Sequence, residues 1–335
     1  MVISALVFVV GIFSLVNRVG GYIDSGITNV LAETTVPKVT SKNQSSTEPK
    51  PVATTEKATE KTTTEKPQPT TSSGINYPVI EKQFLPDGIV YDNISVKNGT
   101  DFTLDVGSEL KENLGFNIEN NHQVQVLIFH THACESYLKD DTGYYDSNYY
   151  PRSTNNSENI VSVGDEIEKQ LKNAGIGVIH DKTQHDYPSY NGSYDRSYET
   201  IMKYMNRYKS IKVVLDIHRD ALGEGGEAGK IKSVFTYKGE KSAQVMIMTG
   251  YEYEGGGDFP FWRDNLRFAL KLQKTAEDMY PGITRPLEFG EYTYNLNVCN
   301  GGLLIEFGTD ANTLDEAKRS GKMMGKALAK VLQNN

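Results

Sequence analysis

The chain has 335 residues, a net charge of -8 at pH 7 and two cysteines, Cys134 and Cys299. No basic block stands out, so the charge argues against a nucleic-acid partner. Two cysteines are too few for a disulfide framework or for a structural zinc site built on thiolates. We expect free thiols in the core, with one disulfide between them as the alternative.

The chain begins with an apolar run. Residues 1–16 carry no charge, and Arg18 ends the run. About 20 apolar residues are needed to span a bilayer, so the segment reaches that length if the residues up to Ile23 contribute. No Lys or Arg precedes the run and no small-residue cleavage site is obvious, which favours an uncleaved anchor over a cleaved signal peptide or a soluble helix. We predict a single-pass transmembrane signal anchor over residues 1–23, with the rest of the chain exported.

Residues 24–75 have the composition of a linker. No aromatic residue lies between Tyr22 and Tyr77, and Thr, Lys, Glu, Ser and Pro dominate. Such a segment has too little apolar surface to offset the entropy lost on ordering, so we predict a disordered tether. Residues 76–122 form a pre-domain segment. It contains two candidate β pieces at 87–93 and 100–106, which either pack on the domain or belong to the stalk.

The folded domain is predicted over residues 123–335. Short apolar runs predict strands, and amphipathic patterns bounded by caps and glycines predict helices. The expected strands are 124–129, 175–181, 211–217, 303–307 and two more between Lys232 and Tyr253 joined by a turn at Gly239. The expected helices are 157–175, 198–208, 260–280 and 314–332. This alternation predicts an α/β fold whose mostly parallel central sheet has helices on both faces.

Polar side chains follow three of these strands, at the edge where ligands bind in open α/β sheets. Two strand ends present histidine and the third presents carboxylates. The residues are His130, His132 and Glu135 after the first strand, His218, Arg219 and Asp220 after the third, and Glu306 and Asp310 at the last.

This pattern predicts a catalytic zinc site. Zinc of this kind takes three ligands from His, Asp or Glu and keeps the fourth position for water, while a carboxylate removes the proton of that water. We assign His132, Glu158 and His218 as metal ligands and Glu306 as the base. His130 is the alternative first ligand, because alternate residues of a strand share a face. Glu158 has a second interpretation, as a complement to a helix N-terminus.

Several segments in order resemble the stage II sporulation protein P family. They are FHTHACESY, NIVSVGDEIEKQL, GIGVIHDKTQHD, SYDRSY, VVLDIHRDA and LLIEFGTDANTLDEA, and the resemblance covers residues 124–332. The family is similar to zinc N-acetylmuramoyl-L-alanine amidases, whose α/β domain has His, Glu, His ligands and a catalytic Glu. Carried over, these roles fall on His132, Glu158, His218 and Glu306.

The resemblance implies a Zn²⁺-dependent, membrane-anchored peptidoglycan hydrolase on the wall or intermembrane side. It would cleave the amide between N-acetylmuramic acid and L-alanine during sporulation engulfment, with endopeptidase action on cross-links as an additional activity. Implied partners are a lytic transglycosylase (stage II protein D) and a membrane anchor protein. Arg219 joins Glu306 as a candidate catalytic residue. Arg219, Asp220 and Arg152 would pair either with substrate carboxylates or with structural partners.

Three other interpretations compete. The first is a metal-independent glycosidase that uses Glu135 and Glu306 as paired carboxylates. In the second, Cys134 is a nucleophile beside a histidine. The third is a non-catalytic wall-binding module on a tether.

Overall fold

The computed structural model describes residues 74–119, 121–253 and 258–334. The predicted anchor over residues 1–23 and nearly all of the predicted linker lie outside the described residues. Within the described ranges, no helix is both long enough and apolar enough to cross a membrane.

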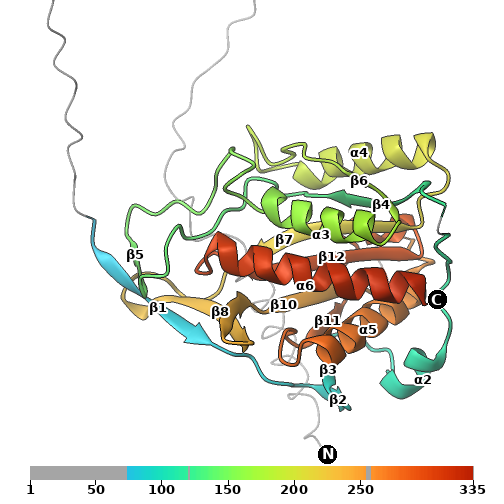
Figure 1. The fold of residues 1–335 in the computed structure, drawn as a ribbon, viewed down its shortest axis with the longest axis horizontal. Helices are drawn as coiled ribbons and strands as arrows, with labels where there is room; N and C mark the ends of the chain where they lie inside the picture. Colours follow the sequence, from blue (N-terminus) through green and yellow to red (C-terminus); the bar gives the residue numbers. More distant parts are fainter. Residues whose placement is uncertain (1–73, 120, 254–257, 335) are drawn as a thin grey trace, which may run out of the picture. The chain divides into compact units, whose positions relative to one another are not determined.

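The central sheet has eight strands in the order β2-β3-β11-β10-β12-β7-β4-β6. Neighbours are parallel except for the pairs β2–β3 and β10–β12, which are antiparallel. The α/β class is confirmed, and the sheet is mixed (Figure 1). The strands are β2 (Ile89–Tyr91), β3 (Ile94–Asn98), β4 (Val124–Phe129), β6 (Gly177–His180), β7 (Val213–Asp220), β10 (Val245–Gly250), β11 (Leu287–Gly290) and β12 (Gly301–Thr309).

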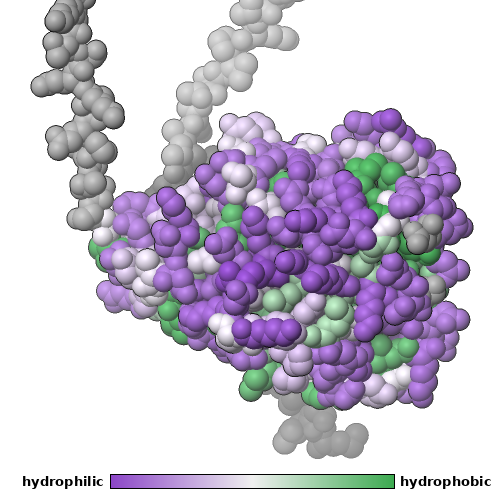
Figure 2. Space-filling view, in the orientation of Figure 1, coloured by the Kyte–Doolittle hydropathy of each residue, from purple (hydrophilic) through white to green (hydrophobic). Residues whose placement is uncertain are grey.

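Helices cover both faces of this sheet, as predicted. They are α2 (Val106–Lys111), α3 (Val161–Asn173), α4 (Ser193–Arg207), α5 (Trp262–Met279) and α6 (Leu314–Gln333). Successive side chains of β4 point to opposite faces of the sheet. Val126 and Ile128 belong to the core packed by α3, α5 and α6, whereas Leu127 and Phe129 pack with Ile201 of α4. Figure 1 shows α3 and α6 in front of the sheet, and Figure 2 shows that their outer surface is largely hydrophilic.

A smaller sheet lies beside the main one, in the order β5-β1-β8-β9. Its strands are β1 (Asn76–Lys82), β5 (Tyr144–Asp146), β8 (Lys230–Tyr237) and β9 (Glu240–Ala243). Residues 76–122 therefore pack on the domain, because they supply β1 to this sheet and β2 and β3 to the main sheet. The piece expected at 100–106 is not a strand; Asp105 caps α2 there by accepting a hydrogen bond from the Ser108 amide at 3.0 Å.

Local signals explain where several elements begin and end. Thr313 and Glu316 form a reciprocal capping box at the start of α6. Gly175 has a φ of 78° and follows the last turn of α3, as the sequence predicted. The α3 helix begins at Val161 without a side-chain cap, three residues beyond Glu158. That late start determines where Glu158 lies.

The alternation of β7 and β12 sets the direction of the functional side chains. On β7, Val213, Leu215 and Ile217 join the core under α3, α5 and α6. Asp216 and His218, at the intervening positions, are directed to the α4 side of the sheet. Glu306 lies opposite His218 in the parallel register of β12 and β7, so the two residues have the same position along adjacent strands.

Candidate metal centre

His132 lies in the turn that follows β4 and is held by the first residue of α4. Its Nε2 lies 3.1 Å from Ser193 Oγ, and that hydroxyl donates to the Tyr190 carbonyl at 2.8 Å. Because the Ser193 hydroxyl uses its proton in the hydrogen bond to Tyr190, its oxygen must accept the hydrogen bond from His132 Nε2–H. This assignment leaves a lone pair on Nδ1. Burial lowers the pKa of His132 to about 4, which keeps the ring neutral.

His218 is buried on β7 and is held by Asp216. His218 Nε2 lies 2.8 Å from Asp216 Oδ1, and Asp216 itself accepts hydrogen bonds from the amide and the hydroxyl of Thr131. Burial acts to lower the pKa of His218, but Asp216 and Glu135 raise it to about 10. The Asp216 contact is an ion pair without hydrogen-bond geometry at Nε2. A carboxylate beside one ring nitrogen of a histidine is the usual outer support of a metal ligand. A metal ion at Nδ1 would displace a proton held there.

Both histidines turn Nδ1 toward the same carboxylate, Glu135. His132 Nδ1 lies 3.7 Å from Glu135 Oε1, and His218 Nδ1 lies 3.7 Å from Glu135 Oε2. The Arg219 amide donates to Glu135 Oε2 at 2.9 Å and so fixes the carboxylate. The three donor atoms lie within 4.8 Å of one another, and all three residues are buried. This donor set fits the three-ligand requirement of a catalytic zinc.

Glu306 supplies a fourth functional group beside the cluster. Its Oε2 is buried and has no hydrogen-bond partner among the described residues. Burial raises the pKa of Glu306 to about 8, against the opposing charge of His218. A buried carboxylate oxygen without a partner is costly for stability, which makes Glu306 a candidate functional residue.

The structure places Glu158, one member of the predicted ligand set, apart from the other two. Glu158 is exposed in the turn before α3 and accepts a hydrogen bond from Ser153 at 3.0 Å. Among the described residues, it does not belong to the group that His132 and His218 form, and the third side chain of that group is Glu135. His130, the alternative first ligand, is fully buried, and its ring nitrogens contact the Ile217 carbonyl and His180, each at 2.8 Å.

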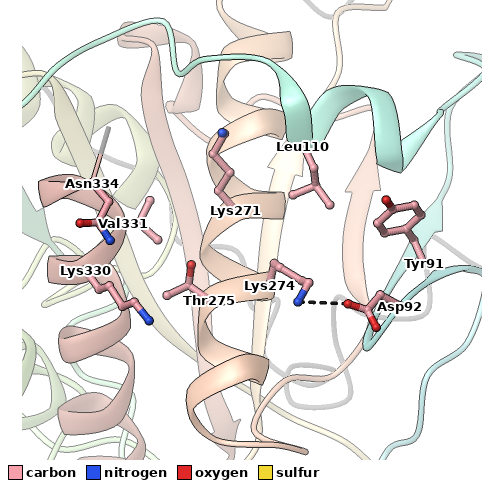
Figure 3. A pocket seen from close by; sticks show the side chains of 9 residues that line it. All are labelled: Tyr91, Asp92, Leu110, Lys271, Lys274, Thr275, Lys330, Val331 and Asn334. Carbon is pink, nitrogen blue, oxygen red and sulfur yellow. Dashed lines mark ion pairs between the residues drawn. The ribbon is translucent and has the colours of Figure 1, made fainter.

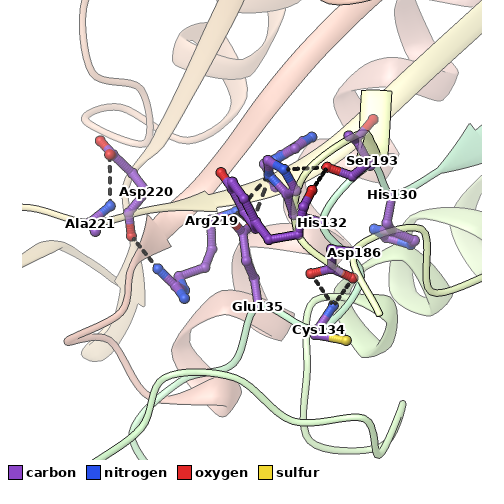
Figure 4. A network of polar contacts seen from close by, with 12 residues as sticks. His130, His132, Cys134, Glu135, Asp186, Ser193, Arg219, Asp220 and Ala221 are labelled. Atoms are coloured by element: carbon purple, nitrogen blue, oxygen red, sulfur yellow. Dashed lines mark hydrogen bonds and ion pairs between the residues drawn. The ribbon is translucent and has the colours of Figure 1, made fainter. Parts of the chain in front are cut away.

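The arginines and the aspartate considered for substrate binding are engaged within the protein. The guanidinium of Arg219 donates to the carbonyls of Ser136, Pro151 and Asp220. The backbone amide of Arg219, rather than its side chain, contacts Glu135, and this arrangement suits a residue that positions the carboxylate. Arg152 pairs with Asp186 and Asp220 pairs with Arg285, each at 2.7 Å. Figure 4 shows Arg219, Asp186 and Asp220 in the polar network around His132 and Glu135.

Both cysteines are free and buried, as expected. Burial raises the pKa of Cys134 to about 12, with Asp186 acting in the same direction. A nucleophilic cysteine needs the opposite shift, toward the thiolate. The structure therefore gives no support to the cysteine-nucleophile interpretation.

A tyrosine cluster borders the site, and the sequence interpretation did not identify it. Tyr190 stacks on the His132 ring with centroids 4.6 Å apart, and 50% of its surface is exposed. Tyr194 contacts His132 edge-on and stacks on Tyr294 at 5.4 Å. An exposed aromatic face beside a polar cluster suits a sugar or peptide ligand.

A separate hollow of about 530 Å³ lies between α2, α5, α6 and the β2–β3 turn. Figure 3 shows lysines on its wall, among them Lys274, which pairs with Asp92 at 3.1 Å. None of the predicted catalytic or metal-binding residues lines it. The candidate site is therefore the buried cluster at the ends of the strands.

Comparisons with solved structures return N-acetylmuramoyl-L-alanine amidases at low similarity. Amidase AmiC2 of Nostoc punctiforme is 13% identical with a TM-score of 0.37, and the match covers 63% of this chain and 96% of that chain. The N-acetylmuramoyl-L-alanine amidase from Clostridium difficile 630 is 14% identical with a TM-score of 0.36, and the match covers 64% of this chain and 97% of that chain.

The sequence comparisons identify the family. Stage II sporulation protein P of Bacillus subtilis (strain 168) is 29% identical over 208 residues, which are 58% of this chain and 48% of that protein. The chain thus aligns with about half the length of that curated relative. The family model of stage II sporulation protein P (SpoIIP) matches residues 19–329. The chain belongs to the stage II sporulation protein P family.

Proposed function

We propose that this protein hydrolyses an amide bond of peptidoglycan with the help of a zinc ion held by His132, Glu135 and His218. The observation that carries the proposal is that the Nδ1 atoms of both histidines face one carboxylate at 3.7 Å. Ser193 and Asp216 hold the Nε2 atoms of the two rings, so that Nδ1 of each ring is the atom available to a metal; at His218 the metal would displace the Nδ1 proton. The bond we propose is the one between N-acetylmuramic acid and L-alanine, with peptide cross-links as secondary substrates.

The proposed chemistry divides between the metal and the chain. A bound zinc ion would supply a Lewis acid and lower the pKa of a water molecule to about 7. Glu306 is the proposed proton carrier, since it lies beside His218 in the strand register and has no competing hydrogen bond at Oε2. In its ionised form it would take a proton as the water oxygen bonds to the carbonyl carbon, and return that proton to the nitrogen as the C–N bond breaks.

Tyr190 is the proposed contact for substrate outside the cluster. Its exposed ring lies against His132 on one side and under the Arg152 guanidinium, 4.8 Å away, on the other. Both contacts limit the motion of the ring and leave half of its surface free. The exposed part of a fixed aromatic ring can contact a sugar or a peptide at little cost in conformational entropy.

The cellular setting is part of the proposal. An apolar segment over residues 1–23 would anchor the chain in the membrane, and the domain would act on the wall or intermembrane side. Membership of a sporulation protein family supports a role in engulfment. A lytic transglycosylase and a membrane anchor protein are the proposed partners. An amidase removes peptides from glycan strands and a transglycosylase cuts those strands, so the two would act on the same polymer.

The test is digestion of purified peptidoglycan by the full chain, with and without added zinc, followed by mass analysis of the products. Release of stem peptides with a free L-alanine amino terminus would support the proposal. Products with cleaved glycan and unchanged activity after chelation would support a glycosidase instead. Glu135 is engaged with both histidines, and no observation favours that alternative.

Variants separate catalysis from binding. His218→Ala should abolish hydrolysis and leave binding to insoluble peptidoglycan intact. Full activity in His218→Ala would overturn the proposal. Binding by the wild-type chain without release of any product would support the wall-binding interpretation.

A further inference from the structure

A second group of metal-ligand side chains lies between α3 and β6. Asp165 and Glu168, one turn apart on α3, both approach His180 at the end of β6. His180 Nδ1 lies 3.1 Å from Asp165 Oδ1 and 3.5 Å from Glu168 Oε2. The His180 side chain is 1% exposed, whereas Asp165 is 46% exposed and Glu168 is 19% exposed. The group therefore has a buried nitrogen donor and two carboxylates open to solvent.

The hydrogen bonds behind this group determine where the protons are. His130 Nδ1 lies 2.8 Å from the Ile217 carbonyl, which can only accept, so Nδ1 carries the proton of that ring. With the proton on Nδ1, the Nε2 of a neutral His130 ring is an acceptor. His180 Nε2, 2.8 Å from His130 Nε2, must therefore donate. In neutral His180 the lone pair is on Nδ1 and is directed at the two carboxylates.

The contacts at His180 Nδ1 do not form ordinary hydrogen bonds. Among the described residues, His180 Nδ1 is buried and has no hydrogen-bond partner of acceptable geometry. Asp165 Oδ1, 3.1 Å away, has an ion pair with Lys182 at 2.6 Å and likewise no hydrogen bond of acceptable geometry. Metal–ligand bonds of about 2.0–2.1 Å place neighbouring donor atoms roughly 3–3.4 Å apart. The observed separations of 3.1 and 3.5 Å are close to that range.

Gly164 shows that the histidine pair is built into the fold. A Cβ atom at this position would lie 2.6 Å from His180 Nε2 and 2.9 Å from His130 Nε2. Any side chain would displace the two rings from each other, because real Cβ contacts are not that short. Glycine in a helix interior lowers stability by about 0.5–1 kcal/mol relative to alanine. Glycine is needed at this position because both histidine rings lie against the backbone of α3, and this explains why the less stable residue is present.

We propose that Asp165, Glu168 and His180 form a second binding site for a divalent transition-metal ion, separate from the cluster of His132, Glu135 and His218. One imidazole and two carboxylates suit zinc and its neighbours in the first transition row. His130 would be the outer partner of His180, since a metal-bound histidine normally donates its other ring N–H. An ion here would join α3 to the end of β6, and through His130 to the carbonyl beside His218.

Two exposed lysines compete for the carboxylates. Lys182 lies 2.6 Å from Asp165 Oδ1, and Lys172 lies 2.6 Å from Glu168 Oε1. Their side chains are 44% and 57% exposed, and such surface pairs contribute little to stability. An ion would displace the ammonium groups into solvent. Removal of Lys182 should therefore tighten metal binding, the opposite of what a purely structural ion pair predicts.

The test uses the full chain with His132→Ala and His218→Ala, so that the proposed catalytic site does not bind metal. After chelator treatment, zinc is added and bound metal is measured by equilibrium dialysis, together with the melting temperature. We expect about one zinc ion per chain and a higher melting temperature with zinc. Adding Asp165→Ala and Glu168→Ala to this background should weaken binding by at least about 100-fold and remove the shift.

Two further variants in the same background complete the test. Lys182→Ala should lower the dissociation constant several-fold. His122→Ala removes an exposed histidine and should change nothing, which controls for adventitious binding. The proposal is overturned if the background variant binds no zinc, or if binding survives the loss of Asp165 and Glu168. Since the proposed catalytic site is absent from this protein, neither result bears on the proposed hydrolase activity.

Discussion

Glu306 on β12 lies directly opposite His218 on β7 in the parallel register of the two strands. Glu306 Oε2 has no hydrogen bond among the described residues. The neighbouring His218 turns its Nδ1 toward Glu135. Each residue has a strongly shifted pKa, about 8 for Glu306 because of burial and about 10 for His218 because Asp216 and Glu135 outweigh burial. Paired shifts of this kind are typical of catalytic sites.

Replacement of Glu306 tests the base. Glu306→Gln keeps the shape of the side chain and removes the proton acceptor, so the rate of amide hydrolysis should fall by about 10²–10⁴-fold. The melting temperature should stay the same or rise, because the amide avoids the cost of a buried, unpaired carboxylate. Zinc content should not change. A variant that keeps the wild-type rate would remove Glu306 from the mechanism.

A matched pair of glutamate variants tests the ligand set. Glu135→Gln should weaken zinc binding by at least about 10–100-fold, because a direct ligand matters at least as much as an outer partner. Glu158→Gln changes an exposed side chain that contacts Ser153, and zinc affinity should be unaffected. Competition with a chromogenic chelator measures both constants. The reverse order of effects would restore the ligand set expected from the sequence.

Arg219→Lys tests whether this arginine positions the site or acts in it. The buried guanidinium donates to three carbonyls through three different nitrogens. The single ammonium nitrogen of lysine cannot reach all three carbonyls. Unfolding in urea should show a loss of about 1–3 kcal/mol. The hydrolysis rate per folded molecule should stay within a few-fold of wild type. Stability like that of wild type with a large loss of rate would instead support the catalytic role predicted from the sequence.

The sequence predicted the strands and their functional ends better than the connecting segments. Apolar runs located β4, β7 and β12, and strand ends in a parallel sheet meet at one edge, so His132, His218 and Glu306 could be grouped in advance. Glu158 was placed with them on the expectation that its helix began at Ser157, but α3 begins at Val161. One turn of helix decided the direction of that side chain.

Glu135 and Ser193 show what sequence patterns cannot supply. Glu135 reaches the cluster because the chain after β4 folds back, with the Glu135 amide donating to the His132 carbonyl at 3.1 Å and a bridge to Arg152. Ser193 supports His132 because α4 begins at residue 193, five residues before the predicted start. The turn at Glu135 and the contact between Ser193 and His132, 61 residues apart, are both features that hydrophobic periodicity does not encode.

The two thiols give a final prediction. Burial raises the pKa of Cys134 to about 12 and that of Cys299 to about 11, so neither forms a thiolate near neutral pH in the folded chain. Iodoacetamide at pH 8 should leave the native protein active and unlabelled, and should label both cysteines in guanidinium chloride. Rapid labelling of Cys134 with loss of hydrolysis would contradict the zinc mechanism and support a thiol nucleophile.

The same thiols predict how stability depends on pH. Because both pKa values rise on folding, the thiols favour the native state until the pH exceeds their unfolded value of 9.0. Stability should then decline as the pH approaches 11–12.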